Sequence, residues 1–381
     1  MTARHIRALD GLRGAAILLV IPHNSEELFQ RSTGIVRIGG IISGAGWIGV
    51  QLFFVLSGFL ITRNLFDSQG ATNYFRVFFA RRVLRIFPLY YVTLLVALIL
   101  VPLCTGTPIG DLFQRDQIWL WTFLLNWAHP LGASTYGLPH FWSLAVEEQF
   151  YFVWPFIVWH ATPRALLKIC GVIAIAALIA RTLLHFGGGT GEMIYEFTVC
   201  RMDALAIGAA TAALLRYPPG AGWLQRLQPH LVPIAVVLAV AGAAVTKAYT
   251  SDNVTTQIIG HTLLAVLFAL VLLACLTDEG TYNRWLRRVF DTAALRSVGR
   301  YSYGMYVLHF PIFLWLQKYS ATFIRLCGRW APLVFVGVVA VLAYVAAIVS
   351  YHVLEKHFLR LKHRFVPRSG QSIPLAIPTA A

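Results

Sequence analysis

The 381-residue chain has few charged side chains, few cysteines and no recognisable metal-binding pattern. Charged residues make up 12% of the sequence and hydrophobic residues 58%, and the mean hydropathy is +0.67. So few charges cannot solvate a globular surface of this size, and so many apolar side chains exclude a disordered chain. Five cysteines are too few for a disulfide framework, and because CxxC and HExxH patterns are absent we expect no metal site. The composition predicts a multi-pass membrane protein.

The excess of positive charge fits membrane topology better than nucleic-acid binding. Lys and Arg number 31 against 16 Asp and Glu, which gives a formal net charge of +15. In a soluble protein this excess would suggest a nucleic-acid partner. In a membrane protein, basic loops gather on the cytoplasmic face, where they also contact lipid headgroups. We therefore expect membrane lipids, and no nucleic acid, as partners.

Ten apolar segments are long enough to cross the hydrocarbon core, which takes about 20 helical residues. A shorter stretch, Trp119–Trp127, is predicted to lie at the interface or to re-enter the membrane. With the N-terminus in the cytoplasm, 22 of the 31 Lys and Arg residues fall on the cytoplasmic side, as the positive-inside rule requires. The sequence thus predicts an all-α polytopic bundle of about ten transmembrane helices with both termini cytoplasmic. The segments cover residues 12–30, 47–63, 86–104, 141–159, 167–185, 199–215, 230–247, 258–276, 301–318 and 331–353.

The chain divides into an integral-membrane domain over residues 1–355 and a short basic cytoplasmic tail over residues 356–381. The first apolar run is interpreted as part of the mature protein. It is short, and a polar stretch from Pro22 to Glu27 follows it in place of a signal-peptide cleavage site. We expect the chemistry to take place within the membrane bundle, because the tail is too short for a soluble domain.

His23 is the most unusual residue of the first span. It follows Arg13 by ten residues, about 15 Å along a helix, which places it near the middle of the membrane. A neutral imidazole there can act as a general base on a hydroxyl, or it can be a structural histidine bonded to a neighbouring helix. Pro22 kinks the helix, which is tolerated only where protein or water covers the freed carbonyl. Position alone leaves both interpretations open.

Glu147 and Glu148 lie about two turns inside the fourth span. As neighbours on a helix they point about 100° apart, so both can face a polar cavity but not one point in it. One buried glutamate of the pair could orient His23 and stabilise its imidazolium, as a carboxylate does beside a catalytic histidine. The alternative is a pair that reaches the interface or bonds to a basic residue.

Five further polar residues are candidates for substrate binding or for structure, because polar groups inside spans are costly. Arg201 and Asp203 in the sixth span either contact substrate or form a local salt bridge. His309 in the ninth span is either functional or a hydrogen-bonding core residue. Asp10 precedes the first span, and a polar pocket near Arg13 or Ser57 could hold an oxyanion.

The second cytoplasmic loop carries a cluster of arginines beside aromatic residues. Arg81, Arg82 and Arg85 share a helical face, and Arg76 precedes them. Guanidinium groups suit phosphates and aromatic rings suit a stacked base, which favours a nucleotide-like ligand. The alternative is a topology signal that contacts anionic lipids, and composition alone favours it.

Six segments, in this order along the chain, carry the most specific signal. Together they resemble acyltransferase family 3, whose members are multi-span membrane proteins that O-acylate bacterial surface glycans and some other acceptors. No single segment is decisive, but six in the family's order are highly specific over about residues 5–311. The segments are LDGLRG at 9–14 followed by His23, GWIGVQLFFVLSGFLI at 46–61, RRVLRIFP at 81–88, FWSLAVEEQFY at 141–151, RMDALAIG at 201–208 and SYGMYVLH at 302–309.

The resemblance implies a bacterial inner-membrane O-acyltransferase of the EC 2.3.1 type. Its donor would be a cytoplasmic acyl-CoA, usually acetyl-CoA, and its acceptor a hydroxyl of an outer carbohydrate or lipid-linked glycan. The resemblance makes His23 catalytic and pairs it with Arg13, and the family's glutamate falls on Glu147 with Glu148 adjacent. The family's arginine motif, which would hold the CoA phosphates, falls on the three clustered arginines. No tightly bound cofactor is expected.

Two questions stay open at this stage. The acceptor hydroxyl attacks either the thioester directly or an acyl group carried transiently by the protein, such as an acyl-histidine. The outer loops at 105–139 and 187–197 are expected to select the acceptor. The alternative function is a transporter or flippase of a sugar-like or lipid-linked solute, which would also have buried ionisable residues in ten spans. Binding of CoA would separate the two, since a transporter has no reason to bind it.

Overall fold

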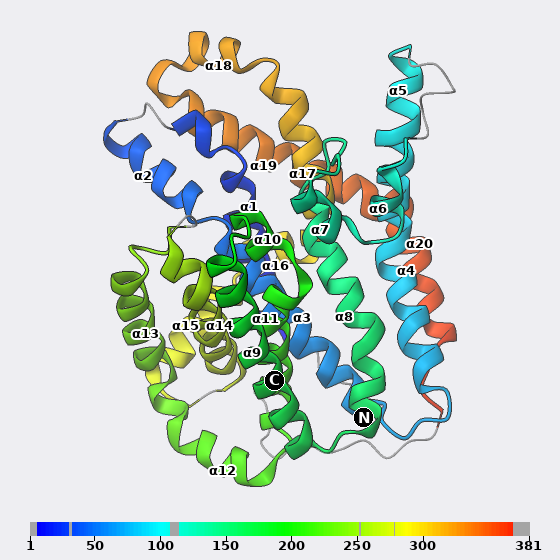
Figure 1. Cartoon of the computed structure of the whole chain (residues 1–381), viewed down its shortest axis with the longest axis vertical. Coiled ribbons are helices and arrows are strands. Elements are labelled where there is room, and N and C mark those ends of the chain that lie inside the picture. The colour runs from blue at the N-terminus through cyan, green and yellow to red at the C-terminus, as the bar shows by residue number, and fades with distance from the viewer. Residues whose placement is uncertain (1–5, 30–32, 107–113, 251–252, 278, 369–381) are drawn as a thin grey trace.

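The computed structural model describes residues 6–29, 33–106, 114–250, 253–277 and 279–368 (Figure 1). This part of the chain is helical and contains no β-strand, so the predicted all-α class is confirmed. Ten long helices form the bundle: α1 (Arg7–His23), α3 (Ile48–Asp67), α4 (Tyr74–Leu95), α8 (Phe141–His160), α9 (Pro163–Phe186), α11 (Thr198–Leu214), α13 (Leu231–Val245), α14 (His261–Leu276), α17 (Ser302–Gln317) and α19 (Ala331–Ser350).

In the described part of the chain, ten shorter α-helices connect or flank the long ones. Each of the ten predicted spans coincides with a long helix, and the differences lie at the ends. The third span, for example, is one helical stretch from Tyr74 to Cys104, because α4 continues through a π-helical turn. The shorter helices are α2 (Gly34–Gly44), α5 (Val101–Cys104), α6 (Gln117–Trp121), α7 (Leu125–Ala128), α10 (Gly191–Glu196), α12 (Pro218–Leu227), α15 (Thr281–Phe290), α16 (Ala293–Arg300), α18 (Ser320–Cys327) and α20 (Lys356–Arg360).

Seven helical stretches of the described chain are long and apolar enough to cross a membrane, so the predicted count of about ten is too high by this measure. The three that fall short are α1 and α17, with 17 and 16 residues, and α8, which the polar run Glu147–Gln149 interrupts. These helices direct polar side chains toward one another inside the bundle. A helix that meets other protein there does not need a fully apolar surface.

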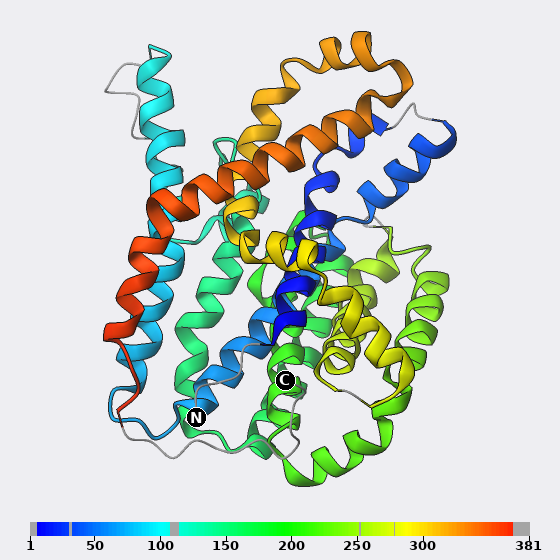
Figure 2. The same cartoon turned by 180° about the vertical axis from the view of Figure 1, so that it is seen from behind.

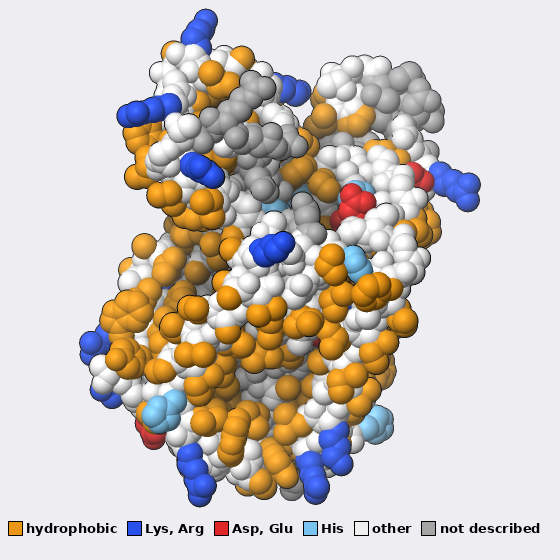
Figure 3. Space-filling model, turned by 60° about the vertical axis from the view of Figure 1, so that its left-hand side comes forward, with side chains coloured by type: hydrophobic (Ala, Val, Ile, Leu, Met, Phe, Trp, Pro, Cys, Tyr) orange, Lys and Arg blue, Asp and Glu red, His pale blue; other side chains and the backbone are white. Residues whose placement is uncertain are grey.

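The surface of the protein fits a membrane environment. Apolar side chains cover most of the middle of the face seen in Figure 3, and Lys and Arg side chains gather toward its two ends. The short apolar stretch at Trp119–Trp127 does not cross the bundle, as predicted, and forms α6 and α7. Tyr90 and Tyr91 of α4 hold it by donating hydroxyl hydrogen bonds to the carbonyls of Leu120 and Trp121, at 2.6 and 3.2 Å.

Glycines allow the central helices to touch through their backbones. A Cβ at Gly58 of α3 would lie 1.9 Å from the carbonyl oxygen of Leu205 in α11. A Cβ at Gly208 of α11 would lie 2.0 Å from the carbonyl oxygen of Val55. Small residues permit such close approach between membrane helices. The contact fixes α11 against α3, the two helices that supply Arg201 and Ser57.

The chain after α19 runs back along α4. It continues through a π-helical turn at Tyr351–Glu355 into α20, and Figure 2 shows this stretch beside α4. Arg81 Nε donates to the carbonyl of Phe365 at 2.8 Å, and Asn73 Nδ2 donates to the carbonyl of Val366 at 2.9 Å. The described part of the predicted basic tail is therefore packed on the bundle, and residues 369–381 lie outside the described chain.

Candidate active site

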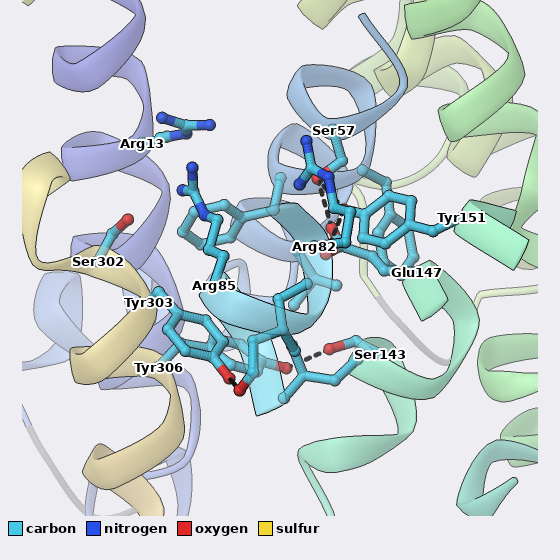
Figure 4. A pocket seen from close by; sticks show the side chains of 15 residues that line it. Arg13, Ser57, Arg82, Arg85, Ser143, Glu147, Tyr151, Ser302, Tyr303 and Tyr306 are labelled. Atoms are coloured by element: carbon cyan, nitrogen blue, oxygen red, sulfur yellow. Dashed lines mark hydrogen bonds between the residues drawn. The ribbon is translucent and has the colours of Figure 1, made fainter. Parts of the chain in front are cut away.

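A cavity of about 90 Å³ lies where α1, α3, α4, α8 and α17 meet. Three guanidinium groups face it, from Arg13 of α1 and from Arg82 and Arg85 of α4 (Figure 4). Helical periodicity explains the pair on α4, because residues three apart lie on the same face. The other polar side chains around the cavity are Ser57, Ser143, Glu147, Tyr151, Ser302, Tyr303 and Tyr306.

Not every arginine of the cavity has a carboxylate as an ion-pair partner. Arg13 lies 3.5 Å from Asp10, one turn before it on α1. No carboxylate of a described residue forms an ion pair with Arg82 or Arg85. The guanidinium of Arg82 lies 5.0 Å from the ring centre of Tyr151. Such groups can form charge-assisted, two-pronged hydrogen bonds with phosphate or carboxylate, so the cavity is a candidate anion site.

Glu147 is the acceptor in a compact hydrogen-bond network. Ser57 Oγ donates to Glu147 Oε1 at 2.7 Å, and the Tyr151 hydroxyl donates to Glu147 Oε2 at 2.9 Å. The network joins α3 to α8 at the wall of the cavity (Figure 4). Its negative charge balances part of the charge of the arginines, which makes a cluster of three guanidinium groups inside the bundle tolerable.

Glu148 lies on another side of α8, as the angle between neighbouring helical residues predicts. It lines a separate groove of about 410 Å³ between α4 and α8, together with Arg82. Its Oε1 is buried and has no hydrogen-bond partner within the described chain. The two glutamates therefore do not act on one ligand atom.

The sequence predicted four arginines at one anion site, and the structure brings two of them to the cavity. Arg81 points away and donates to the carbonyl of Phe365, and Arg76 is exposed one turn earlier on α4. Neither lines the cavity. Neighbouring helical residues point about 100° apart, so Arg81 and Arg82 face different surroundings, and the predicted binding roles of Arg76 and Arg81 stay predictions.

His23 lies in a second cavity of about 510 Å³, away from the arginines. Its Nδ1–H donates to the carbonyl of Ser43 at 3.2 Å, which leaves the basic lone pair of the neutral ring on Nε2. The hydroxyl of Ser43 donates to the carbonyl of Pro22, which lies in the last turn of α1. The predicted contact between Glu147 and His23 is wrong: Glu147 lines the other cavity and bonds to Ser57 and Tyr151.

His309 is fully buried and supports the end of α1. Its Nδ1–H donates to the carbonyl of Tyr306 at 2.6 Å, and its Nε2 accepts from Asn24 Nδ2 at 2.8 Å. Asn24 follows His23 directly. His309 thus fits the core hydrogen-bonding interpretation and lines neither cavity.

The predicted local salt bridge between Arg201 and Asp203 is wrong, because each has a partner elsewhere. Asp203 pairs with Arg181 of α9 at 2.9 Å, and both side chains are fully buried. Arg201, also fully buried, donates to His261 Nδ1 at 2.5 Å and to Gln51 Oε1 at 2.7 Å. Side chains two apart on a helix point in nearly opposite directions.

Several residues of the two cavities were not singled out from the sequence. Tyr303 and Tyr306 line the arginine cavity, and Trp47, Tyr195 and His261 line the histidine cavity. The tyrosines belong to the segment SYGMYVLH, where hydroxyl groups in an apolar span were the available signal. His261 begins a long apolar helix, and nothing in its neighbourhood marks it.

The fold and the two cavities define a multi-pass membrane protein whose interior holds an arginine cavity and a histidine cavity on opposite parts of α1. An acyltransferase domain model matches residues 6–352, nearly the whole chain. The chain therefore belongs to this acyltransferase family, and the resemblance expected from the six segments is confirmed.

Known relatives extend this assignment. The peptidoglycan O-acetyltransferase OatA of Listeria monocytogenes is 28% identical over 325 residues, which cover 81% of this chain and 49% of that protein. YrhL of Bacillus subtilis is 29% identical over 379 residues, which cover 93% of this chain and 55% of YrhL. The O-acetyltransferase OatA of Staphylococcus aureus is 25% identical over 331 residues, 83% and 52% respectively. The chain thus spans about half the length of these relatives. No solved structure matches it.

Proposed function

We propose that this protein is a membrane-bound O-acyltransferase that moves an acyl group, in the first place acetyl, from cytoplasmic acyl-CoA to a hydroxyl of an extracytoplasmic carbohydrate. It would lie in a bacterial cytoplasmic membrane with both termini inside. Family membership and the names of the relatives, two of which are O-acetyltransferases, support this proposal. Peptidoglycan, the acceptor named for the Listeria relative, is the first carbohydrate to test.

The observation that carries the proposal is the cavity with two guanidinium groups, Arg82 and Arg85, that lack a carboxylate partner among the described residues. Both arginines are half-buried, and an anionic ligand would offset their positive charge inside the bundle. CoA carries phosphates at one end and the acyl thioester at the end of a flexible pantetheine arm. Phosphates held by the arginines would leave the arm to extend along α1 toward His23.

His23 is the proposed general base. Arg13 of the arginine cavity and His23 of the histidine cavity lie ten residues apart on α1, about 15 Å. This distance is comparable with the length of the pantetheine arm. His23 Nε2 takes the proton of the acceptor hydroxyl, the hydroxyl oxygen bonds to the acyl carbon, and the bond from that carbon to sulfur breaks. The imidazolium then returns the proton to the CoA thiolate. Glu147 has a different role from the one predicted, because it positions Ser57 and Tyr151 and balances charge at the donor end.

The test uses purified protein in nanodiscs with acetyl-CoA and an envelope glycan extract, and it follows free CoA thiol and labelled acetyl transfer. We expect the wild type and His23→Ala to bind CoA alike, and only the wild type to turn over. His160→Ala, at the exposed end of α8, is the matched control and should turn over normally. A folded wild type that does not bind CoA would refute the donor assignment and favour a transporter. Full turnover by His23→Ala would refute the role of the base.

A further inference from the structure

The histidine cavity has a second imidazole in its wall, and its ring proton lies on the other nitrogen from that of His23. His261, the first residue of α14, lines it together with His23. Trp47 also lines the cavity, and its ring centre lies 5.1 Å from that of His261. Its chain neighbour Gly46 packs against α1, where an added Cβ would come within 2.8 Å of His23 Cβ. The cavity therefore has a histidine contributed by α1 and another contributed by α14.

The tautomer of His261 is fixed by Arg201. Arg201 Nη1 donates to His261 Nδ1 at 2.5 Å, and a guanidinium is always a donor. Nδ1 therefore has no proton, and the proton of the neutral ring lies on Nε2. Among the described residues Nε2 has no hydrogen-bond partner, and it is not one of the buried unsatisfied atoms, so it borders the cavity. His261 thus presents an N–H donor to whatever occupies the cavity.

The guanidinium of Arg201 contacts neutral side chains. Gln51 Oε1 accepts its second hydrogen bond at 2.7 Å, and its guanidinium lies 5.0 Å from the ring centre of Tyr195. No carboxylate of the described chain forms an ion pair with it. Because the positively charged Arg201 donates a hydrogen bond to Nδ1, His261 cannot take a second proton there. Its ring therefore stays neutral, and its Nε2–H keeps a fixed direction.

His23 has the complementary tautomer. Because its Nδ1–H donates to the carbonyl of Ser43, its basic lone pair lies on Nε2. One histidine of the cavity is therefore arranged to accept a proton and the other to donate a hydrogen bond. Acyl transfer needs both, a base for the attacking hydroxyl and a donor for the oxyanion that forms on the acyl oxygen.

We propose that His261 stabilises the oxyanion of the acyl transfer through its Nε2–H, and that Arg201 is the positioning residue that fixes this tautomer. This inference rests on the proposed function. The acceptor hydroxyl gives its proton to His23 Nε2 while its oxygen bonds to the thioester carbon, and the negative charge on the former carbonyl oxygen accepts the hydrogen bond from His261. Collapse restores the C=O bond, breaks the bond to sulfur and passes the proton from His23 to the thiolate.

The remaining wall of the cavity fits a sugar as the acceptor. Trp47 and Tyr195 offer aromatic faces, and Thr190, Glu192 and Gln257 offer hydroxyl, carboxylate and amide groups. Rings with a few polar groups are the usual way to hold a neutral, hydroxyl-rich molecule. Thr190 through Tyr195 belong to the 187–197 segment, which the sequence predicted to select the acceptor.

The test compares His261→Phe with His261→Gln, whose amide retains both an acceptor for Arg201 and an N–H donor. Turnover is followed as CoA thiol release at saturating acetyl-CoA with the same envelope glycan extract, and CoA affinity is measured alongside. We expect His261→Phe to lower the turnover number about 10²–10³-fold with CoA affinity unchanged, as loss of one oxyanion donor does. His261→Gln should stay within about tenfold of wild type.

His261→Phe also removes the hydrogen-bond acceptor of the buried Arg201 guanidinium, which can destabilise the fold. The double variant Arg201→Met, His261→Phe removes the donor without leaving that charge buried. It should lose no more turnover than His261→Phe alone, because Arg201 acts only through the donor that His261→Phe already removes. His160→Phe is the control and should behave as wild type. A folded double variant with wild-type turnover, or His261→Gln as impaired as His261→Phe, would overturn the inference. If instead the wild type fails to transfer acetyl, or His23→Ala does not lose activity, the proposed function itself fails.

Discussion

Neutralising the cavity arginines one at a time is the sharpest test of the donor site. Arg82→Gln and Arg85→Gln each remove one charge from the cavity wall, and glutamine keeps much of the aliphatic stem that packs there. A hydrogen bond to a charged group contributes about 1.5–3 kcal/mol. Loss of one guanidinium–phosphate contact should therefore weaken CoA affinity about 10- to 150-fold.

Isothermal titration of CoA into protein in nanodiscs measures this effect. Arg76→Gln is the matched control, because Arg76 is an exposed arginine of the same helix outside the cavity, and its affinity should change by less than about twofold. Arg82→Lys should fall between wild type and Arg82→Gln, since it keeps the charge and loses the planar fork. The reasoning is refuted if folded Arg82→Gln and Arg85→Gln both bind CoA as tightly as wild type, or if Arg76→Gln loses as much.

Three further predictions concern stability, measured by thermal unfolding in detergent. Gly58→Ala should cost about 1–3 kcal/mol, because its Cβ meets a backbone carbonyl, whereas Gly171→Ala, where no atom lies within 4 Å, should be neutral or stabilising; equal effects would contradict the close packing of α3 and α11. Asp203→Asn should cost about 3–5 kcal/mol because it leaves a buried guanidinium of α9 unpaired, and a loss below about 1 kcal/mol would contradict that pairing. His129, in the loop before α8, hydrogen-bonds to Glu196, which raises the pKa of the imidazole. Its contribution should be complete below the ordinary histidine pKa of about 6.5 and be lost as the pH rises through the raised value, so His129→Gln should lower the melting temperature more at pH 5.5 than at pH 9, and a difference that does not change with pH would refute it.

Apolar length and charge placement were enough to predict the membrane class, the all-α fold and the position of all ten long helices. They overestimated the number of apolar spans, because α1 and α17 are short and α8 carries a polar run. The six ordered segments also indicated the family. Periodicity along one helix correctly placed Glu147 and Glu148 on different sides, since that depends on local geometry alone.

Local sequence could not decide which helices face one another, and the site depends on that. Glu147 was expected beside His23, but the packing of α3 against α8 places it where it accepts a hydrogen bond from Ser57. Asp203 forms its ion pair with Arg181 rather than with Arg201. His261 could not be found at all from its surroundings, because its hydrogen-bond partner is an arginine 60 residues earlier in the chain. A side chain's type and depth are written in the sequence, whereas its partners are fixed only when backbone contacts such as those at the glycines of α3 and α11 set the distance between helices.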